Sequence, residues 1–474
     1  MALESAAPWL ILAAYVAVTW WATPRRTSSA QFFDGRSNSG VQPGILLVAL
    51  SAAITWVFAK SIANAADLAY AFGITGGIGY TLYYLSFVVA GITIYFIRQR
   101  GGYRSLSHFL TDKYGAFCAR LFLLTIAFRL FNEVWSNTKV MALYFGPEGS
   151  GGYWLAAVLV TAFTASYAWS GGLRASLLTD RVQTLFAFVL LGIILTVLFP
   201  DLSAKGAPEI DPIVYQSGLT FCLLALVQVL SYPFHDPVLT DRGFLNAPRK
   251  MLVSFLLAGV LSGGFIFLFS VVGLYARAEG LPANPSVSVP AAFGLVMMLV
   301  FNGIMLLSGG STIDSTFASV SKLAARDWRN ERADPTARQL QIGRYAVIAI
   351  AVLGNLPLLT IYLGDKAGPA IIAATTISGT MVMGLAPIFL LSWLRAAGPL
   401  SFHLAFWPGL VFGVLRTIEA FAKIPIFPEA IALGTGKYAV DLGINVFGLL
   451  ICTIGYLLGA VIESKVRRAI PAST

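Results

Sequence analysis

Five oxygen-bearing side chains lie close together in the mostly apolar segment Asn302–Asp327. They are Ser308, Ser311, Thr312, Asp314 and Ser315. On a helix the four hydroxyl residues share one face, since their spacing is i, i+3, i+4 and i+7. Hydroxyl and carboxylate oxygens suit a hard monovalent cation such as sodium. The alternative, hydroxyls that only bond to their own helix backbone, accounts less well for five such groups together.

A lysine stands deep inside another apolar segment, Pro43–Tyr70. Lys60 lies too far from either end of this segment to be a terminal anchor, and it shares a helical face with Asn64. Ionisable groups at membrane depth usually face a bundle interior or a water-filled path. We therefore expect Lys60 to line a cavity, with a structural ion pair or a snorkelling lysine as the alternatives.

Two further segments place charged groups inside apolar stretches. Arg129 and Glu133 can pair on one helical face; a structural pair is the better interpretation of Arg129, and Glu133 is left open. His235 and Asp236 stand between two prolines, Pro233 and Pro237, which remove backbone donors. Such a break at membrane depth lines protein or water, although a simple helix exit into the cytoplasm would give the same pattern.

The composition predicts the elements that position these residues. The chain has 474 residues, of which 57% are hydrophobic and only 11% are charged, against about 25% charged residues in soluble domains. This excludes an ordinary soluble enzyme, a disordered chain and a nucleic-acid binder, and it indicates a multi-pass helical membrane protein. Three scattered histidines and three distant cysteines form no metal, nucleophile or disulfide arrangement, so we expect no enzyme.

Apolar stretches of spanning length recur thirteen times, and we predict one helix for each. The expected spans are 6–23, 42–66, 74–97, 117–145, 152–170, 175–199, 217–236, 251–275, 290–322, 342–363, 369–394, 400–421 and 440–462. The first span follows an acidic Glu4 and precedes Arg25 and Arg26, which is the reverse of a signal peptide, so we expect it to be retained.

The basic residues predict the orientation. With the N-terminus outside, 23 of the 32 Lys and Arg residues lie in or beside inside loops and five in outside loops. This bias follows the positive-inside rule and predicts a cell-membrane protein with a cytoplasmic C-terminus. It also explains the net charge of +10 as contact with the inner leaflet of the lipid bilayer, so no nucleic-acid partner is needed.

Four motifs resemble those of the sodium/solute symporter family, which includes sodium–glucose, sodium–proline and sodium–sialic acid transporters. Across about residues 30–395 they are, in chain order, SHFLTDKYG (107–115), GGLRASLLTDRVQ (171–183), TDRGFLNAPRK (240–250) and SGGSTIDSTFASVSKLAARD (308–327). The resemblance implies an all-α LeuT-like core built as a five-plus-five inverted repeat. The single transporter domain, 1–474, would hold a peripheral helix at 6–23, repeats at 42–199 and 217–394, and two peripheral helices within 400–462.

The resemblance also implies site residues. A first sodium site would use the backbone carbonyls of Ile54 and Val57 with side chains of Ser308, Ser311 and Thr312. A second cation or proton site would use Asp180, Asp314 and Ser315. Substrate contacts would fall at Lys60 and Ser61 and near His235 and Asp236. The polar helix faces described above add Asn64 and Glu133 to the predicted substrate contacts.

This chain departs from the family pattern at two places, one of which bears on the substrate. Sugar carriers place an acidic and an amide residue where this chain has Lys60 and Ser61, so a lysine here suggests a substrate carboxylate, unless Asp236 or Glu133 neutralises it. The usual methionine before Ser311 is Gly310, which would loosen the helix locally.

We therefore predict a sodium-coupled symporter that imports a small organic solute by alternating access, with Na⁺ as the coupling ion and no other cofactor or metal. A proton-coupled or facilitative carrier on the same fold is the nearest alternative. A transporter-like membrane sensor is the alternative from another class.

Overall fold

The computed structural model describes residues 2–206, 208–376 and 378–469, and within these ranges the regular elements are all helical. Short 3-10 turns connect several of the α-helices. The α-helices are α1 (Ala2–Ala22), α2 (Ser29–Asp34), α3 (Ile45–Trp56), α4 (Ala59–Phe72), α5 (Ile74–Leu82), α6 (Ser86–Gly101), α7 (Leu106–Tyr114), α8 (Ala116–Ala142), α9 (Gly151–Lys205), α10 (Pro212–Gln228), α11 (Pro237–Thr240), α12 (Pro248–Phe269), α13 (Val271–Ala278), α14 (Pro285–Phe293), α15 (Leu295–Ala325), α16 (Ala337–Leu353), α17 (Gly364–Ala374), α18 (Leu385–Leu390), α19 (Pro399–Ala422) and α20 (Ala439–Ala469).

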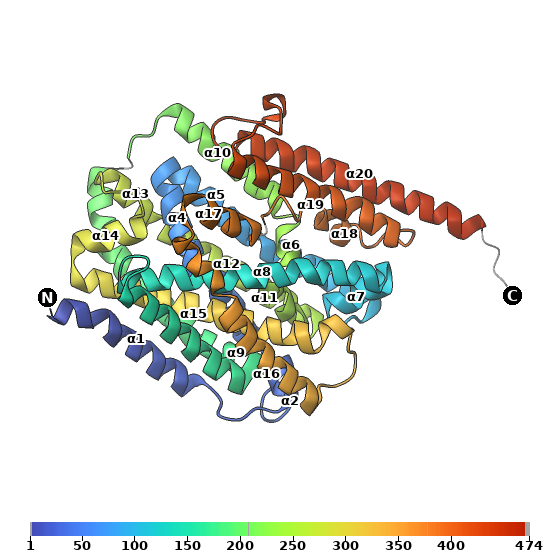
Figure 1. The fold of residues 1–474 in the computed structure, drawn as a ribbon, viewed down its shortest axis with the longest axis horizontal. Helices are drawn as coiled ribbons and strands as arrows, with labels where there is room; N and C mark the ends of the chain where they lie inside the picture. Colours follow the sequence, from blue (N-terminus) through green and yellow to red (C-terminus); the bar gives the residue numbers. More distant parts are fainter. Residues whose placement is uncertain (1, 207, 377, 470–474) are drawn as a thin grey trace.

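The bundle is organised around α15. This helix packs against α9, α8, α16, α1 and α3, and its middle turns are almost completely buried. α19 and α20 pack on one another at the edge of the bundle, and α20 reaches the rest through α10 and α18 (Figure 1). α1 begins at one end of the molecule and α20 ends at the other (Figure 1).

Seven helices in the described part of the chain are long and apolar enough to cross a membrane, or eight if the bent pair α3–α4 forms one span. The predicted count of thirteen is thus not confirmed. α1 and α10 are shorter apolar helices, α8 carries buried Arg129 and Glu133, and the expected span 369–394 is divided between α17 and α18.

The expected span 42–66 is broken in its middle. α3 and α4 are bent by 59° at Val57 and Phe58, in a stretch without glycine or proline. Neighbouring side chains bond to the backbone groups that the break frees: Tyr84 Oη donates to the Trp56 carbonyl at 2.9 Å, and Thr312 Oγ1 donates to the Thr55 carbonyl at 3.2 Å. Inside a membrane such pairing is what permits irregular backbone.

A glycine divides the two spans predicted at 152–170 and 175–199. α9 has 55 residues, and a straight helix of that length would measure about 80 Å, far more than the roughly 30 Å of a bilayer core. At Gly172 the backbone leaves helical geometry, with φ 51° and ψ −140°. A Cβ there would lie 2.6 Å from the Phe32 ring and carbonyl.

We predict that Gly172→Ala lowers the melting temperature of the purified protein. Alanine is disfavoured at this position for two reasons, because the backbone has a positive φ and because the added Cβ would clash with Phe32. Gly192→Ala is the matched control on the same helix, because a Cβ there has open space and ordinary φ. Equal melting temperatures for the two variants would show that the kink does not need glycine.

Candidate functional site

The hydroxyl face of α15 lies against the C-terminal end of α3. Thr312 donates to the Thr55 carbonyl, and the Ser308 hydroxyl is completely buried without a hydrogen-bond partner. α3 ends at Trp56 with Val57 as its C-cap, and the last carbonyls of a helix carry partial negative charge. The structure therefore brings the predicted ligands of the first sodium site, Ser308, Ser311 and Thr312, to the end of α3 that carries Ile54 and Val57.

Asp180 is the centre of a second polar cluster next to this one. Its carboxylate is fully buried and accepts hydrogen bonds from Ser311 at 2.5 Å and Ser51 at 2.5 Å, among others. Asp314 accepts from Tyr167 at 2.8 Å, Thr179 at 3.1 Å and Ser315 at 3.1 Å. The residues predicted for a second cation or proton site, Asp180, Asp314 and Ser315, thus belong to one hydroxyl-rich cluster.

This cluster holds an arginine that the sequence analysis placed in an inside loop. Arg242 is 0% exposed, and its guanidinium lies 3.1 Å from Asp180. It lies in the motif TDRGFLNAPRK, but the charged residues of this turn predict a solvent-exposed loop and give no sign of its burial. Its remaining partners are the hydroxyls of Ser51, Thr55, Ser176 and Ser315 and the carbonyl of Val238.

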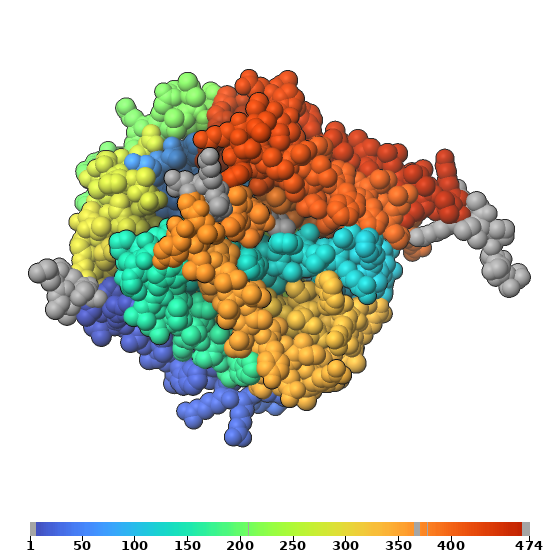
Figure 2. Space-filling model, viewed as in Figure 1, coloured from blue at the N-terminus to red at the C-terminus, as the bar shows by residue number. Residues whose placement is uncertain are grey.

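A cavity of about 610 Å³ opens beside the break between α3 and α4. In Figure 2 the blue segment of α4 and α5 is seen at the floor of a recess between the yellow-green and the orange-red parts of the chain. Aromatic rings form much of the wall: Trp56, Phe58, Tyr80, Tyr83, Tyr84, Trp135, Phe221, Tyr232 and Tyr438. This volume is typical of sites for small organic ligands.

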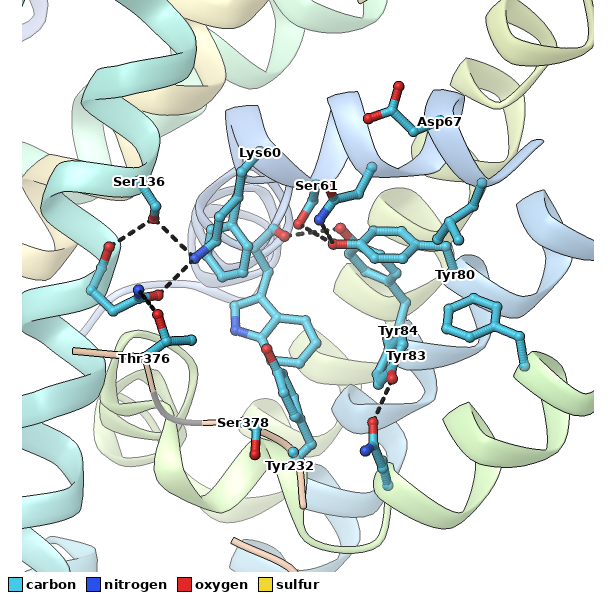
Figure 3. Close-up of a pocket in the computed structure, with 18 of the residues that line it drawn as sticks. Lys60, Ser61, Asp67, Tyr80, Tyr83, Tyr84, Ser136, Tyr232, Thr376 and Ser378 are labelled. Carbon is cyan, nitrogen blue, oxygen red and sulfur yellow. Dashed lines mark hydrogen bonds between the residues drawn. The ribbon is translucent and has the colours of Figure 1, made fainter. Parts of the chain in front are cut away.

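Of the six predicted substrate contacts, three line this cavity. Lys60 extends toward Ser136 of α8, and Ser61 accepts a hydrogen bond of 2.9 Å from Tyr80, as Figure 3 shows. Asn64 lies one turn further along α4 and is exposed. The aromatic residues of the wall were not predicted, because their places around the cavity depend on how distant helices pack.

The other three predicted contacts lie behind the wall. Glu133, His235 and Asp236 are 0% exposed and do not line the cavity, so direct substrate contact does not describe them in this structure. The Nδ1 of His235 bonds to the Tyr232 carbonyl. The physical reason is that these side chains bond to protein groups: Glu133 pairs with Lys60 and Arg129, and Asp236 accepts from Arg129 and Trp56.

Two cations and two carboxylates form a neutral network under the cavity. Glu133 pairs with both Lys60, at 2.7 Å, and Arg129, and this confirms the expected pairing of Arg129 with Glu133. Arg129 also reaches Asp236 at 3.1 Å. Lys60 is therefore neutralised by Glu133 and not by Asp236. The Lys60 side chain is 20% exposed while Glu133 is fully buried, so the side chain of the pair that faces the cavity is the positively charged lysine.

We predict that Glu133→Gln destabilises the protein more than Lys60→Gln. Removing the Glu133 charge leaves Lys60 without a carboxylate partner and Arg129 with Asp236 alone, and breaking a buried pair costs roughly 3–5 kcal/mol. Removing Lys60 leaves Glu133 paired with Arg129. Thermal unfolding of both variants in the same detergent tests the order, and a larger loss for Lys60→Gln would contradict it.

In the described part of the chain no group of three or more His, Cys, Asp or Glu side chains could hold a metal ion. The predicted cation site of α15 would use hydroxyl and carbonyl oxygens instead. Gly310 does not break α15, which is continuous; a Cβ at Gly310 would lie 1.9 Å from the Tyr15 hydroxyl. The expected local loosening is therefore wrong: the missing side chain admits Tyr15 of α1.

No family model and no curated protein matches this chain. Among solved structures, the chain is similar to a Na⁺-coupled sialic acid symporter in a substrate-bound outward-open state, with TM-score 0.70 and 14% identity over 97% of this chain and 98% of that one. It is also similar to a nucleobase-cation-symport-1 family transporter in a closed conformation with bromovinylhydantoin bound, with TM-score 0.56 and 13% identity over 94% and 98% of the two chains.

These similarities confirm the predicted fold class. The protein is a multi-pass helical membrane protein with the LeuT-like fold of secondary transporters. At such low identity the likeness shows the fold, and the function has to be argued from the residues of this chain.

Proposed function

We propose that this protein is a sodium-coupled symporter that takes up a small organic anion. One observation carries the proposal: the buried Ser308 hydroxyl has no partner and lies on the same face of α15 as Thr312, which donates to the Thr55 carbonyl at the end of α3. The first of the similar structures is described as Na⁺-coupled, and hydroxyl and carbonyl oxygens are ligands that sodium accepts.

The mechanism follows from the break between α3 and α4. Sodium held between α15 and the end of α3 would fix α3, and α4 continues directly into the cavity with Lys60 and Ser61. Ordering one side of the break orders the other, so sodium and substrate raise each other's affinity by linkage. Alternating access then exposes both to the cytoplasm, which is the side that the basic loops indicate.

The cavity supports an anionic substrate with a ring or another apolar portion. The Lys60 ammonium donates to Glu133, Asn132 and Ser136 at 2.7, 3.3 and 3.1 Å, and a substrate carboxylate would replace one of the two neutral acceptors. The tyrosine and tryptophan rings around it offer an apolar surface with hydroxyl groups at its edge.

The proposed architecture keeps the two repeats at 42–199 and 217–394, with the helices at 6–23 and 400–462 outside them. The N-terminus is proposed outside and the C-terminus in the cytoplasm. The first cation site comprises Ile54, Val57, Ser308, Ser311 and Thr312, and the substrate contacts are Lys60, Ser61 and Asn64.

We predict that sodium raises the melting temperature of the purified protein at constant ionic strength, relative to potassium or choline. A ligand that binds only the folded state stabilises by RT ln(1 + [L]/Kd), about 2.7 kcal/mol at a hundredfold excess. Ser308→Ala should weaken the sodium midpoint about tenfold, equivalent to about 1.4 kcal/mol. Ser321→Ala is the matched control, because its hydroxyl bonds to the backbone of Phe317 and Gly343 on the far side of the site.

A sodium effect that is absent, or that survives Ser308→Ala unchanged, would contradict the proposed ion site. A proton-coupled or facilitative carrier, or a membrane sensor, would then fit the fold better. Uptake into proteoliposomes distinguishes these alternatives, since a sensor moves no solute and a proton-coupled carrier responds to an imposed pH gradient without sodium.

We predict that carboxylates with an aromatic or apolar portion are taken up into proteoliposomes under an inward sodium gradient, and that a neutral sugar and a neutral nucleobase are not. Lys60→Met should raise the KM for the transported carboxylate by tenfold or more, since a hydrogen bond to a charged group contributes about 1.5–3 kcal/mol. Uptake of the neutral solutes, with Lys60→Met without effect, would overturn the anion assignment and leave sodium coupling in place.

A further inference from the structure

We infer that the transported carboxylate carries a cationic nitrogen at its far end, and that Asp67 binds this nitrogen. The inference rests on the proposed sodium-coupled uptake of a carboxylate and narrows the substrate to an amino-carboxylate. Lys60, Asn64 and Asp67 follow one another at i, i+4 and i+7 along one face of α4, and all three line the cavity. The cavity therefore has a lysine near the start of α4 and a carboxylate two turns further on.

Asp67 differs from the carboxylates under the cavity because it has no partner. Glu133 and Asp236 are fully buried, and each is paired with a cation of α4 or α8. Among the described residues, none forms a hydrogen bond or an ion pair with the Asp67 carboxylate, which is half-buried. A carboxylate that is partly removed from water lacks compensation until a cation arrives. Asp67 thus offers the cavity a negative charge that the protein itself does not neutralise.

The tyrosines on the α5 side of the cavity present acceptors to a ligand. A tyrosine hydroxyl has a single hydrogen to donate. Tyr80 donates it to Ser61 at 2.9 Å, and Tyr83 donates it to Gln228 Oε1 at 2.5 Å (Figure 3). The Asn64 amide already uses the Tyr80 oxygen as an acceptor, at 3.5 Å. A ligand that meets these two hydroxyls therefore has to supply the hydrogen, as an ammonium group does.

The direction of the Tyr83 hydrogen bond is determined by α20. The Asn445 amide of α20 donates through Nδ2 to the Asp441 carbonyl at 2.8 Å, so its Oδ1 is an acceptor. Gln228 Nε2 donates to this Oδ1 at 3.3 Å, which leaves Gln228 Oε1 as the acceptor for Tyr83. A helix at the edge of the bundle thus determines that the Tyr83 oxygen can only accept from a ligand.

The two charged side chains of α4 lie well apart. Seven residues of helix separate Lys60 from Asp67, which is a rise of about 10 Å. Lys60 extends toward Ser136 of α8, on the other side of the view from Asp67 (Figure 3). The nitrogen and the carboxyl carbon of an α-amino acid are only about 2.5 Å apart by standard bond lengths. A chain or a ring between the two charged groups fits this spacing better, and the aromatic wall offers rings that attract both an apolar portion and a cation.

The test compares carboxylates with and without an amine at the far end. The pairs are ε-aminocaproate with caproate, and para-aminomethylbenzoate with para-toluate, in proteoliposomes under an inward sodium gradient. We expect the amine to lower the KM about tenfold in wild type, because a hydrogen bond to a charged group contributes about 1.5–3 kcal/mol. Asp67→Asn should remove this advantage and leave the KM of caproate unchanged. Its melting temperature should also stay unchanged, since Asp67 has no partner among the described residues.

Two further variants and a control separate recognition from a general effect of charge. Asp67→Glu should keep the preference for the amine. Asp67→Lys should reverse it, so that adipate, with a second carboxylate in place of the amine, competes better than ε-aminocaproate. Asp201→Asn is the matched control, because Asp201 is an exposed carboxylate near the end of α9 that does not line the cavity. It should leave every KM unchanged.

The competing role for Asp67 is to pair with Lys437, an exposed lysine that also lines the cavity, when the cavity closes. In that case Asp67→Asn and Lys437→Gln would both lower kcat for caproate and ε-aminocaproate alike, and the inference would be wrong. Equal KM values within each pair in wild type would also overturn it, while sodium-coupled uptake of carboxylates would stand. No uptake of any carboxylate, together with no sodium effect on the melting temperature, would overturn the proposed function itself.

Discussion

The break between α3 and α4 is the feature on which the rest of the structure depends. A helix that stops in the middle of a membrane protein frees backbone groups that water cannot reach, and these must find partners within the protein. Tyr84 and Thr312 supply them from other helices. The same break places the end of α3 against the hydroxyls of α15 on one side and starts α4, with Lys60, at the cavity on the other. The proposed ion site and the cavity thus both depend on one interruption.

The buried carboxylates of the two polar clusters are paired with cations in different ways. Under the cavity, two cations and two carboxylates balance, and the exposed member is Lys60. Asp180 is paired with Arg242, which belongs to a turn far away in sequence, while Asp314 of the same cluster accepts hydrogen bonds from hydroxyl groups. Burial of either carboxylate alone would be very costly, since an isolated buried charge has neither water nor a counter-ion. The pairings therefore hold α4 to α8 and the turn after α11 to α3, α9 and α15.

The same pairings bear on how the molecule can move. Ser311 bonds to Asp180, and Asp180 bonds to Arg242, so a ligand that engages Ser311 also acts on the helices that meet at this cluster. Coupling between ion and substrate then needs no long pathway. It runs through α3 and its break, over a few residues between Thr55 and Lys60. In the proposed mechanism this break lies between the two ligands.

The apolar spans, the bias of basic residues to one side and the hydroxyl face of residues 308–315 follow from the sequence alone, because hydropathy and helical period are local properties. The pairing of Arg129 with Glu133 is also local, at i and i+4.

Three features were determined only by the tertiary structure. The break at Val57 and Phe58 contains no glycine or proline, so its position depends on partners from other helices. His235 and Asp236 are turned away from the cavity by the packing of their turn. From the sequence, Arg242 is expected in a loop. Its burial between α3, α9 and α15 could not be predicted, because its contact with Asp180 joins residues 62 positions apart.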